Sequence, residues 1–192
     1  MISDMQMDTI ASKTSKTLLN FNASVKLSAS EKNRLKKAIV AALDVCGEFA
    51  LKNGKRHGLG LGGVSSLQLS MNLCGTAKIK SLNKAWRNKD YATDVLSFPV
   101  HDDLRGNEFP LPPELELGDL FVCHQIAIKQ AKEYEVSWEQ EIVHLYIHGF
   151  LHLLGFDHEL SHDEEVIMQK HEQNLVKKAY QLIGWGKNGQ YS

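Results

Sequence analysis

Two histidines at helical spacing and a third just beyond a glycine form the segment whose residue types and spacing are best suited to chemistry. The segment reads HGFLHLLGFDH and spans residues 148–158. On a helix, His148 and His152 project from the same face, so both imidazoles can reach one metal ion. Gly155 favours a left-handed helix end that turns the chain back, and His158 can then supply a third nitrogen. The spacing therefore predicts a metal site with these three histidines as ligands.

Three neutral imidazoles would leave a bound Zn²⁺ with its full charge and one position for water. Such an ion is a Lewis acid that lowers the pKa of bound water toward about 7. The spacing resembles that of HExxH zinc peptidases, but Gly149 replaces the glutamate that serves as their general base. A closed structural zinc site would need a fourth protein ligand, usually cysteine, and Cys123 stays a candidate if the fold brings it near.

The role of a fourth histidine on the same expected helix face follows from the length of a helical turn. At about 1.5 Å per residue, His144 and His152 lie roughly 12 Å apart along the axis. That distance is too long for one ion bound at about 2.1 Å from each nitrogen. The third ligand, His158, follows the Gly155 turn at the end of the helix where His152 lies, so we expect the metal beside His152. His144 is then one turn away, where it supports a ligand, faces substrate or is simply packed. Asp157 either orients a ligating imidazole or shapes the turn.

The composition is that of an ordinary soluble globular protein, with 192 residues of which 43% are hydrophobic and 23% charged. The 22 Lys and Arg residues nearly balance 23 Asp and Glu, which excludes nucleic-acid binding by bulk charge. The three cysteines form no CxxC pair, which favours a reducing compartment. No signal peptide or membrane span is expected, so the sequence predicts a cytoplasmic protein without a membrane partner.

Hydrophobic periodicity predicts an α+β fold, a single domain in which a small mixed sheet of about four strands packs with helices. Residues 1–27 are a poorly defined segment that can contain a strand at 18–25, residues 28–183 form the metal-dependent domain, and residues 184–192 are a polar tail.

The other expected strands are 66–73, 93–98 and 117–123. The expected helices are one that starts at Ser28 with a Ser28–Glu31 capping box, then 77–86, 126–134, 138–154 and 163–183. The glycine-rich residues 53–63 and residues 101–113 are expected to be loops, the former a flexible insertion.

The histidine segment resembles the signature H-G-x-L-H-L-x-G-[YF]-D-H of the YbeY family of bacterial endoribonucleases. The similarity covers about residues 66–175, with Ala92 where a proline is usual. Further matching positions are 82–83, 87–90, 93–99, 117–120, Glu141, Met168 and Glu172. The resemblance implies a single α+β domain, one Zn²⁺ per chain and cleavage of single-stranded RNA. It further implies roles in ribosomal RNA maturation and ribosome quality control, with the ribosome or ribosomal proteins as partners and no DNA substrate.

Arg87 lies among Lys78, Lys80, Lys84 and Lys89, and the lysines fit a solvated basic face. Phosphodiester cleavage needs a cation that grips phosphate oxygens, which a planar guanidinium does bidentately and lysine does not. Because Arg87 also falls on the arginine position of the resembled family, we expect it to be catalytic. Ordinary roles are expected for Asp94 and Ser97, and for the histidines without a partner at ligand spacing, which are His57, His101, His124, His162 and His171.

Together these features predict a zinc-dependent endoribonuclease that acts on single-stranded RNA. One alternative is a zinc metallohydrolase of another substrate, such as a peptide or small phosphoester. The other is a non-catalytic zinc-containing factor that binds ribosomes. Zinc-bound hydroxide and the RNA 2′-hydroxyl are both possible nucleophiles at this stage.

Overall fold

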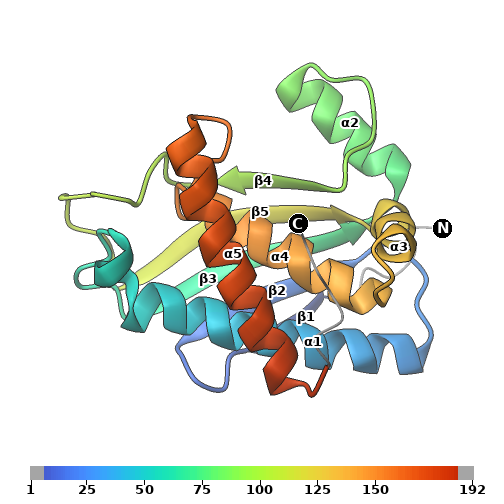
Figure 1. Cartoon of the computed structure of the whole chain (residues 1–192), viewed down its shortest axis with the longest axis horizontal. Helices are drawn as coiled ribbons and strands as arrows, with labels where there is room; N and C mark the ends of the chain where they lie inside the picture. The colour runs from blue at the N-terminus through green and yellow to red at the C-terminus, as the bar shows by residue number, and fades with distance from the viewer. Residues whose placement is uncertain (1–6, 186–192) are drawn as a thin grey trace.

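A five-stranded mixed sheet with helices on both faces forms the framework of the computed structural model, which describes residues 7–185 (Figure 1). The strands are β1 (Met7–Ala11), β2 (Thr17–Ala23), β3 (Ser66–Cys74), β4 (Val95–Pro99) and β5 (Glu114–Cys123). The helices are α1 (Ala29–Gly47), α2 (Thr76–Arg87), α3 (His124–Glu133), α4 (Trp138–Leu153) and α5 (His162–Leu182). The predicted α+β class is confirmed.

The sheet has the strand order β1-β2-β3-β5-β4, which is one strand more than the sequence predicted. β2, β3 and β5 run parallel, whereas β1 and β4 are antiparallel edge strands. β1 is the strand that sequence reasoning missed, inside the segment predicted to be poorly defined. From Asp8 to Ala11 only Ile10 is deeply buried, and an edge strand can be held mainly by backbone pairing with β2.

Helices α1, α4 and α5 cover one face of the sheet, and α2 lies against the other (Figure 1). β3 alternates buried apolar residues with partly buried polar ones, so along most of its length only one of its faces lies in an apolar core. The α2 side has a smaller core of four buried residues, which are Cys74, Ile79, Leu96 and Cys123. The larger core surrounds α4, so the helix that carries the histidines is fixed on nearly all sides.

Gly149 allows α4 to approach the sheet closely. A Cβ atom at this position would lie 2.7 Å from Leu120 Cδ2 and 3.5 Å from Val95 Cγ2. The position therefore faces the sheet, and a large side chain there would push the helix away from β4 and β5. This is a packing reason for glycine at a position where zinc peptidases carry glutamate.

The glycine-rich residues 53–63 are more ordered than a flexible insertion. A π-helical turn, Glu48–Lys52, extends α1, and a 3₁₀ turn, Gly54–His57, follows it. Leu59 and Leu61 are buried in the main core, and Leu59 pairs with Arg105 across an isolated bridge. These apolar anchors fix the segment, and they were overlooked because the glycines dominate its composition. Of the predicted polar tail, residues 186–192 lie outside the described residues.

Candidate metal centre

Helix α4 and the turn after it bring the three predicted ligands together. The helix starts at a capping box in which Ser137 accepts from the Gln140 backbone and Gln140 accepts from the Ser137 backbone. It ends at a turn where Gly155 has a φ of 91°, a conformation that residues with a Cβ rarely adopt. A Cβ there would also lie 2.3 Å from Asp103 Oδ1. This turn returns the chain so that His158 lies beside the last turn of α4.

The ligand atoms of His148, His152 and His158 all lie within 4.8 Å of one another. The Nε2 atoms of His148 and His152 are 3.2 Å apart. Two nitrogens bound at about 2.1 Å to one tetrahedral ion lie roughly 3.4 Å apart, so the observed spacing fits a shared metal. Within residues 7–185, this is the one group of three or more ligand-type side chains at such spacing.

The surroundings of His152 favour its neutral imidazole. Burial, followed by the neighbouring His148 and His158, lowers the pKa of His152 to about 4. A metal ion binds the unprotonated nitrogen, so a histidine that stays neutral well below pH 7 is ready for ligation. The three-histidine group therefore fits Zn²⁺ in spacing, and His152 fits it in charge state as well.

Glu172 of α5 contacts two of the α4 histidines through one carboxylate oxygen. Its Oε1 lies 3.2 Å from Nδ1 of His148 and 2.8 Å from Nε2 of His144. Burial opposes the carboxylate charge, but the hydrogen bonds with His144 and His148 outweigh it and lower the pKa of Glu172 to about 2. A carboxylate that accepts from Nδ1 fixes the tautomer whose Nε2 is free to bind a metal. Glu172 is thus placed to orient His148.

His144 lies outside the three-histidine group, one turn before His148. Burial opposes its protonation, but hydrogen bonds to Glu141 and Glu172 dominate and raise the pKa of His144 to about 9. The sequence left three roles open for His144, and the contacts favour support of a ligand. His144 contacts Glu172, and Glu172 in turn contacts His148. Sequence reasoning noted Glu172 only as a matching position, because the packing of α5 on α4 that creates this contact is not encoded in local spacing.

Arg87 ends α2, where the next residue, Asn88, adopts a left-handed conformation with a φ of 56°. The Arg87 guanidinium lies 3.3 Å from Oε1 of Glu159, the residue after His158. The structure thus brings the predicted catalytic arginine to the turn that carries the third predicted ligand. Its side chain is 42% exposed, so it can exchange this carboxylate for another anion.

The other residues considered in the sequence have local contacts. Asp157 accepts a hydrogen bond from the Glu159 backbone, which favours the turn-shaping interpretation. Asp94 accepts from the Val95 backbone and from Gln130, as expected for a structural carboxylate. Cys123 is buried with its Sγ 3.8 Å from Gln125 Oε1, and it does not belong to the histidine group.

Four of the five histidines for which ordinary roles were expected lie in packing or surface contacts. His57 stacks on Phe49 and meets the edge of His171, which also contacts Phe156. His124 packs edge-to-face with Trp138, and exposed His162 lies 3.4 Å from Glu165.

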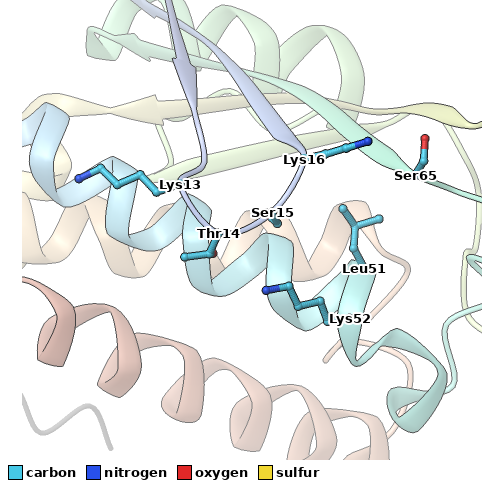
Figure 2. A pocket seen from close by; sticks show the side chains of 7 residues that line it. All are labelled: Lys13, Thr14, Ser15, Lys16, Leu51, Lys52 and Ser65. Carbon is cyan, nitrogen blue, oxygen red and sulfur yellow. The ribbon is translucent and has the colours of Figure 1, made fainter.

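A hollow lies at the turn between β1 and β2, and no imidazole or thiol group lines it (Figure 2). Its lining consists of Lys13, Thr14, Ser15, Lys16, Leu51, Lys52 and Ser65. In Figure 2 the amino groups of Lys13 and Lys16 point in opposite directions, so they do not converge on one ligand. This hollow offers no metal-ligating side chain and is not the functional site.

The fold and the histidine group define an α+β protein with a three-histidine site that could hold a metal ion. None of the helices in residues 7–185 has the length and apolar character needed to cross a membrane. The family profile of endoribonuclease YbeY matches residues 20–180. The chain therefore belongs to the endoribonuclease YbeY family, which confirms the resemblance drawn from the histidine segment.

Individual relatives agree with this assignment. Endoribonuclease YbeY of Alkaliphilus metalliredigens is 43% identical over 109 residues, which cover 57% of this chain and 68% of the relative. The chloroplastic endoribonuclease YBEY of Arabidopsis thaliana is 43% identical over 129 residues, covering 67% of this chain but 20% of that longer protein. The solution structure of TM1509 from Thermotoga maritima has a TM-score of 0.53 at 21% identity, with 91% of this chain and 97% of that chain covered. This last likeness supports the fold alone.

Proposed function

We propose that this protein is a zinc-dependent endoribonuclease that cleaves phosphodiester bonds of single-stranded RNA. The observation that carries the proposal is the convergence of His148, His152 and His158 in a member of the endoribonuclease YbeY family. We further propose roles in ribosomal RNA maturation and ribosome quality control, with the ribosome or its proteins as partners. Membership of a family whose members are named endoribonucleases supports the RNA-cleaving part of this proposal.

One Zn²⁺ per chain is the metal that the donor set favours. Three imidazole nitrogens within 4.8 Å of one another suit zinc, and burial lowers the pKa of His152, which keeps that imidazole neutral. When bound, zinc supplies Lewis-acid chemistry to an RNA phosphate and to water. Glu172 accepts a hydrogen bond from Nδ1 of His148, so that Nε2 of His148 is free to face the metal position.

Arg87 binds the phosphate in this proposal. Its guanidinium can leave the half-exposed contact with Glu159 and grip two phosphate oxygens, where it stabilises the charge that develops during phosphoryl transfer. The location of Arg87 beside the turn of His158 supports this role, because phosphate and metal must meet at one place.

Peptide hydrolysis is less favoured by the geometry. A glutamate at position 149 could not serve as a general base here, since that position faces Leu120 in the core rather than the histidines. The three buried free cysteines suit a reducing compartment, and we propose that the protein works in the cytoplasm.

The proposal is tested by incubating purified protein with labelled single-stranded RNA, with ribosomal RNA and with casein, each with and without a chelator. We expect cleavage of both RNAs, loss of cleavage in chelator and recovery when zinc is restored, with casein intact. Cleavage of casein alone would favour the peptidase alternative. Zinc-loaded protein that binds ribosomes but cleaves no RNA would favour the non-catalytic factor.

A further inference from the structure

The end of α2 exposes a large aromatic side chain next to Arg87. Trp86 is 72% exposed, although tryptophan usually lies mostly inside a folded protein. Its ring packs edge-to-face against Phe98 of β4, with 5.7 Å between the ring centroids, and this contact fixes its position. Phe98 in turn meets Phe121 of β5 in the same manner at 5.7 Å. The indole is therefore supported from beneath by the sheet and open on its outer side.

The residues around Trp86 are strongly basic. Between Thr76 and Asp90 the chain has five cations and one carboxylate, although the whole protein has a net charge of −1. The cations are Lys78, Lys80, Lys84, Arg87 and Lys89. Lys80 and Lys84 both lie near Asp90, at 3.6 and 3.5 Å, and each is at least half exposed. We call Trp86 with these five cations the Trp86 surface.

An exposed aromatic ring among cations is the combination that binds unpaired nucleotides. Bases stack on the ring, while the lysines and arginine neutralise the phosphates. A duplex keeps its bases stacked on one another and cannot offer a free base face to Trp86. One end of the Trp86 surface reaches the turn that carries His158, because Arg87, the residue after Trp86, contacts Glu159.

We infer that the Trp86 surface is a binding site for single-stranded RNA, in which Trp86 stacks on an unpaired base next to the phosphate held by Arg87. The inference rests on the proposed function and adds a physical origin for single-strand preference. The charge of the segment, five cations in the fifteen residues 76–90 that include Trp86, is what favours RNA over an uncharged apolar partner.

The test measures binding apart from cleavage. A fluorescent single-stranded RNA with 2′-O-methyl groups, and a duplex of the same sequence, are titrated with zinc-loaded protein and followed by anisotropy. Stacking of one base is worth about 1–3 kcal/mol. Trp86→Ala should therefore weaken single-strand binding about five-fold or more, and Trp86→Phe should stay within about three-fold of the parent protein. Duplex binding should be the same in all variants.

Tyr134→Ala is the matched control. Tyr134 is an aromatic residue with 46% exposure, and it precedes the start of α4, which lies about 15 Å along the helix from His148 and about 21 Å from His152. This variant should bind single-stranded RNA like the parent protein. Unchanged zinc content and circular dichroism in Trp86→Ala confirm that the fold is intact.

Two results would overturn the inference. Single-strand affinity of Trp86→Ala within two-fold of the parent would do so, and would point to an acidic protein as the partner of this surface. An equal loss of duplex and single-strand affinity would also contradict base stacking. Because the probe resists cleavage by a 2′-hydroxyl, a protein that binds through Trp86 but cleaves no RNA supports the inference and refutes only the proposed function. A protein that cleaves RNA with unchanged affinity in Trp86→Ala does the reverse.

Discussion

At the scale of single residues, His144, His148 and His152 lie one turn apart on α4, but only the last two converge with His158. His144 instead contacts Glu172 at 2.8 Å. We therefore predict that His152→Ala and His158→Ala lose most bound zinc, whereas His144→Ala retains it. Elemental analysis after identical purification measures this. Loss of zinc in His144→Ala with retention in His152→Ala would move the site by one turn and contradict the ligand set.

Arg87 allows binding to be separated from chemistry. Arg87→Lys keeps the positive charge but loses the planar pair of donors, so we expect unchanged fold and zinc content. Because loss of one oriented donor to a developing anion costs on the order of 10²-fold in rate, single-turnover RNA cleavage should fall by about that factor. Cleavage within a few-fold of the parent protein would reduce Arg87 to a solvated surface charge.

At the scale of elements, the turn after α4 sets the position of the third ligand. Gly155→Ala forces a Cβ into a φ of 91° and toward Asp103 Oδ1. We expect a loss of about 2 kcal/mol or more in the free energy of unfolding, together with weaker zinc binding because His158 shifts. Gly62→Ala is the control, since its Cβ would meet nothing within 4 Å and its backbone is not left-handed. Equal melting temperatures and zinc affinities for the two variants would argue against this role of the turn.

The contrast between local and distant contacts explains how much could be predicted from the sequence. The ligand trio follows from helical spacing and one glycine, so it is readable in eleven consecutive residues. Glu172 lies 24 residues beyond His148, and its role depends on the packing of α5 against α4. β1 escaped prediction because an edge strand needs little apolar pattern, and Leu59 was hidden among glycines. Contacts made by tertiary packing leave no periodic signal in the chain.

At the scale of the whole molecule, buried histidines make stability depend on pH. Burial, followed by the charges of His57 and Lys170, lowers the pKa of His171 to about 4. The unfolded chain therefore takes up this proton more readily, so the stabilising contribution is present above about pH 6.5 and is lost as the pH falls toward 4. His144 has the opposite sign, because its raised pKa of about 9 makes its contribution fade as the pH rises from about 6.5 to 9.

We predict that His171→Phe, which keeps a ring against Phe49 and Phe156, flattens the fall of stability between about pH 6.5 and 4. Urea unfolding of chelator-treated protein at a series of pH values measures this slope without a contribution from metal binding. An acid slope identical in variant and parent would show that His171 does not titrate in this range.

We propose that one zinc ion, held by His148, His152 and His158, makes this protein a ribonuclease. The most direct measurement is single-turnover cleavage of labelled single-stranded RNA while zinc is added stepwise to chelator-treated, dialysed protein of known concentration. We predict no cleavage at the start, a linear rise, and a sharp plateau at one equivalent of zinc per chain, with no rise in His152→Ala. Cleavage that persists without zinc, or that rises equally in His152→Ala, would contradict the account.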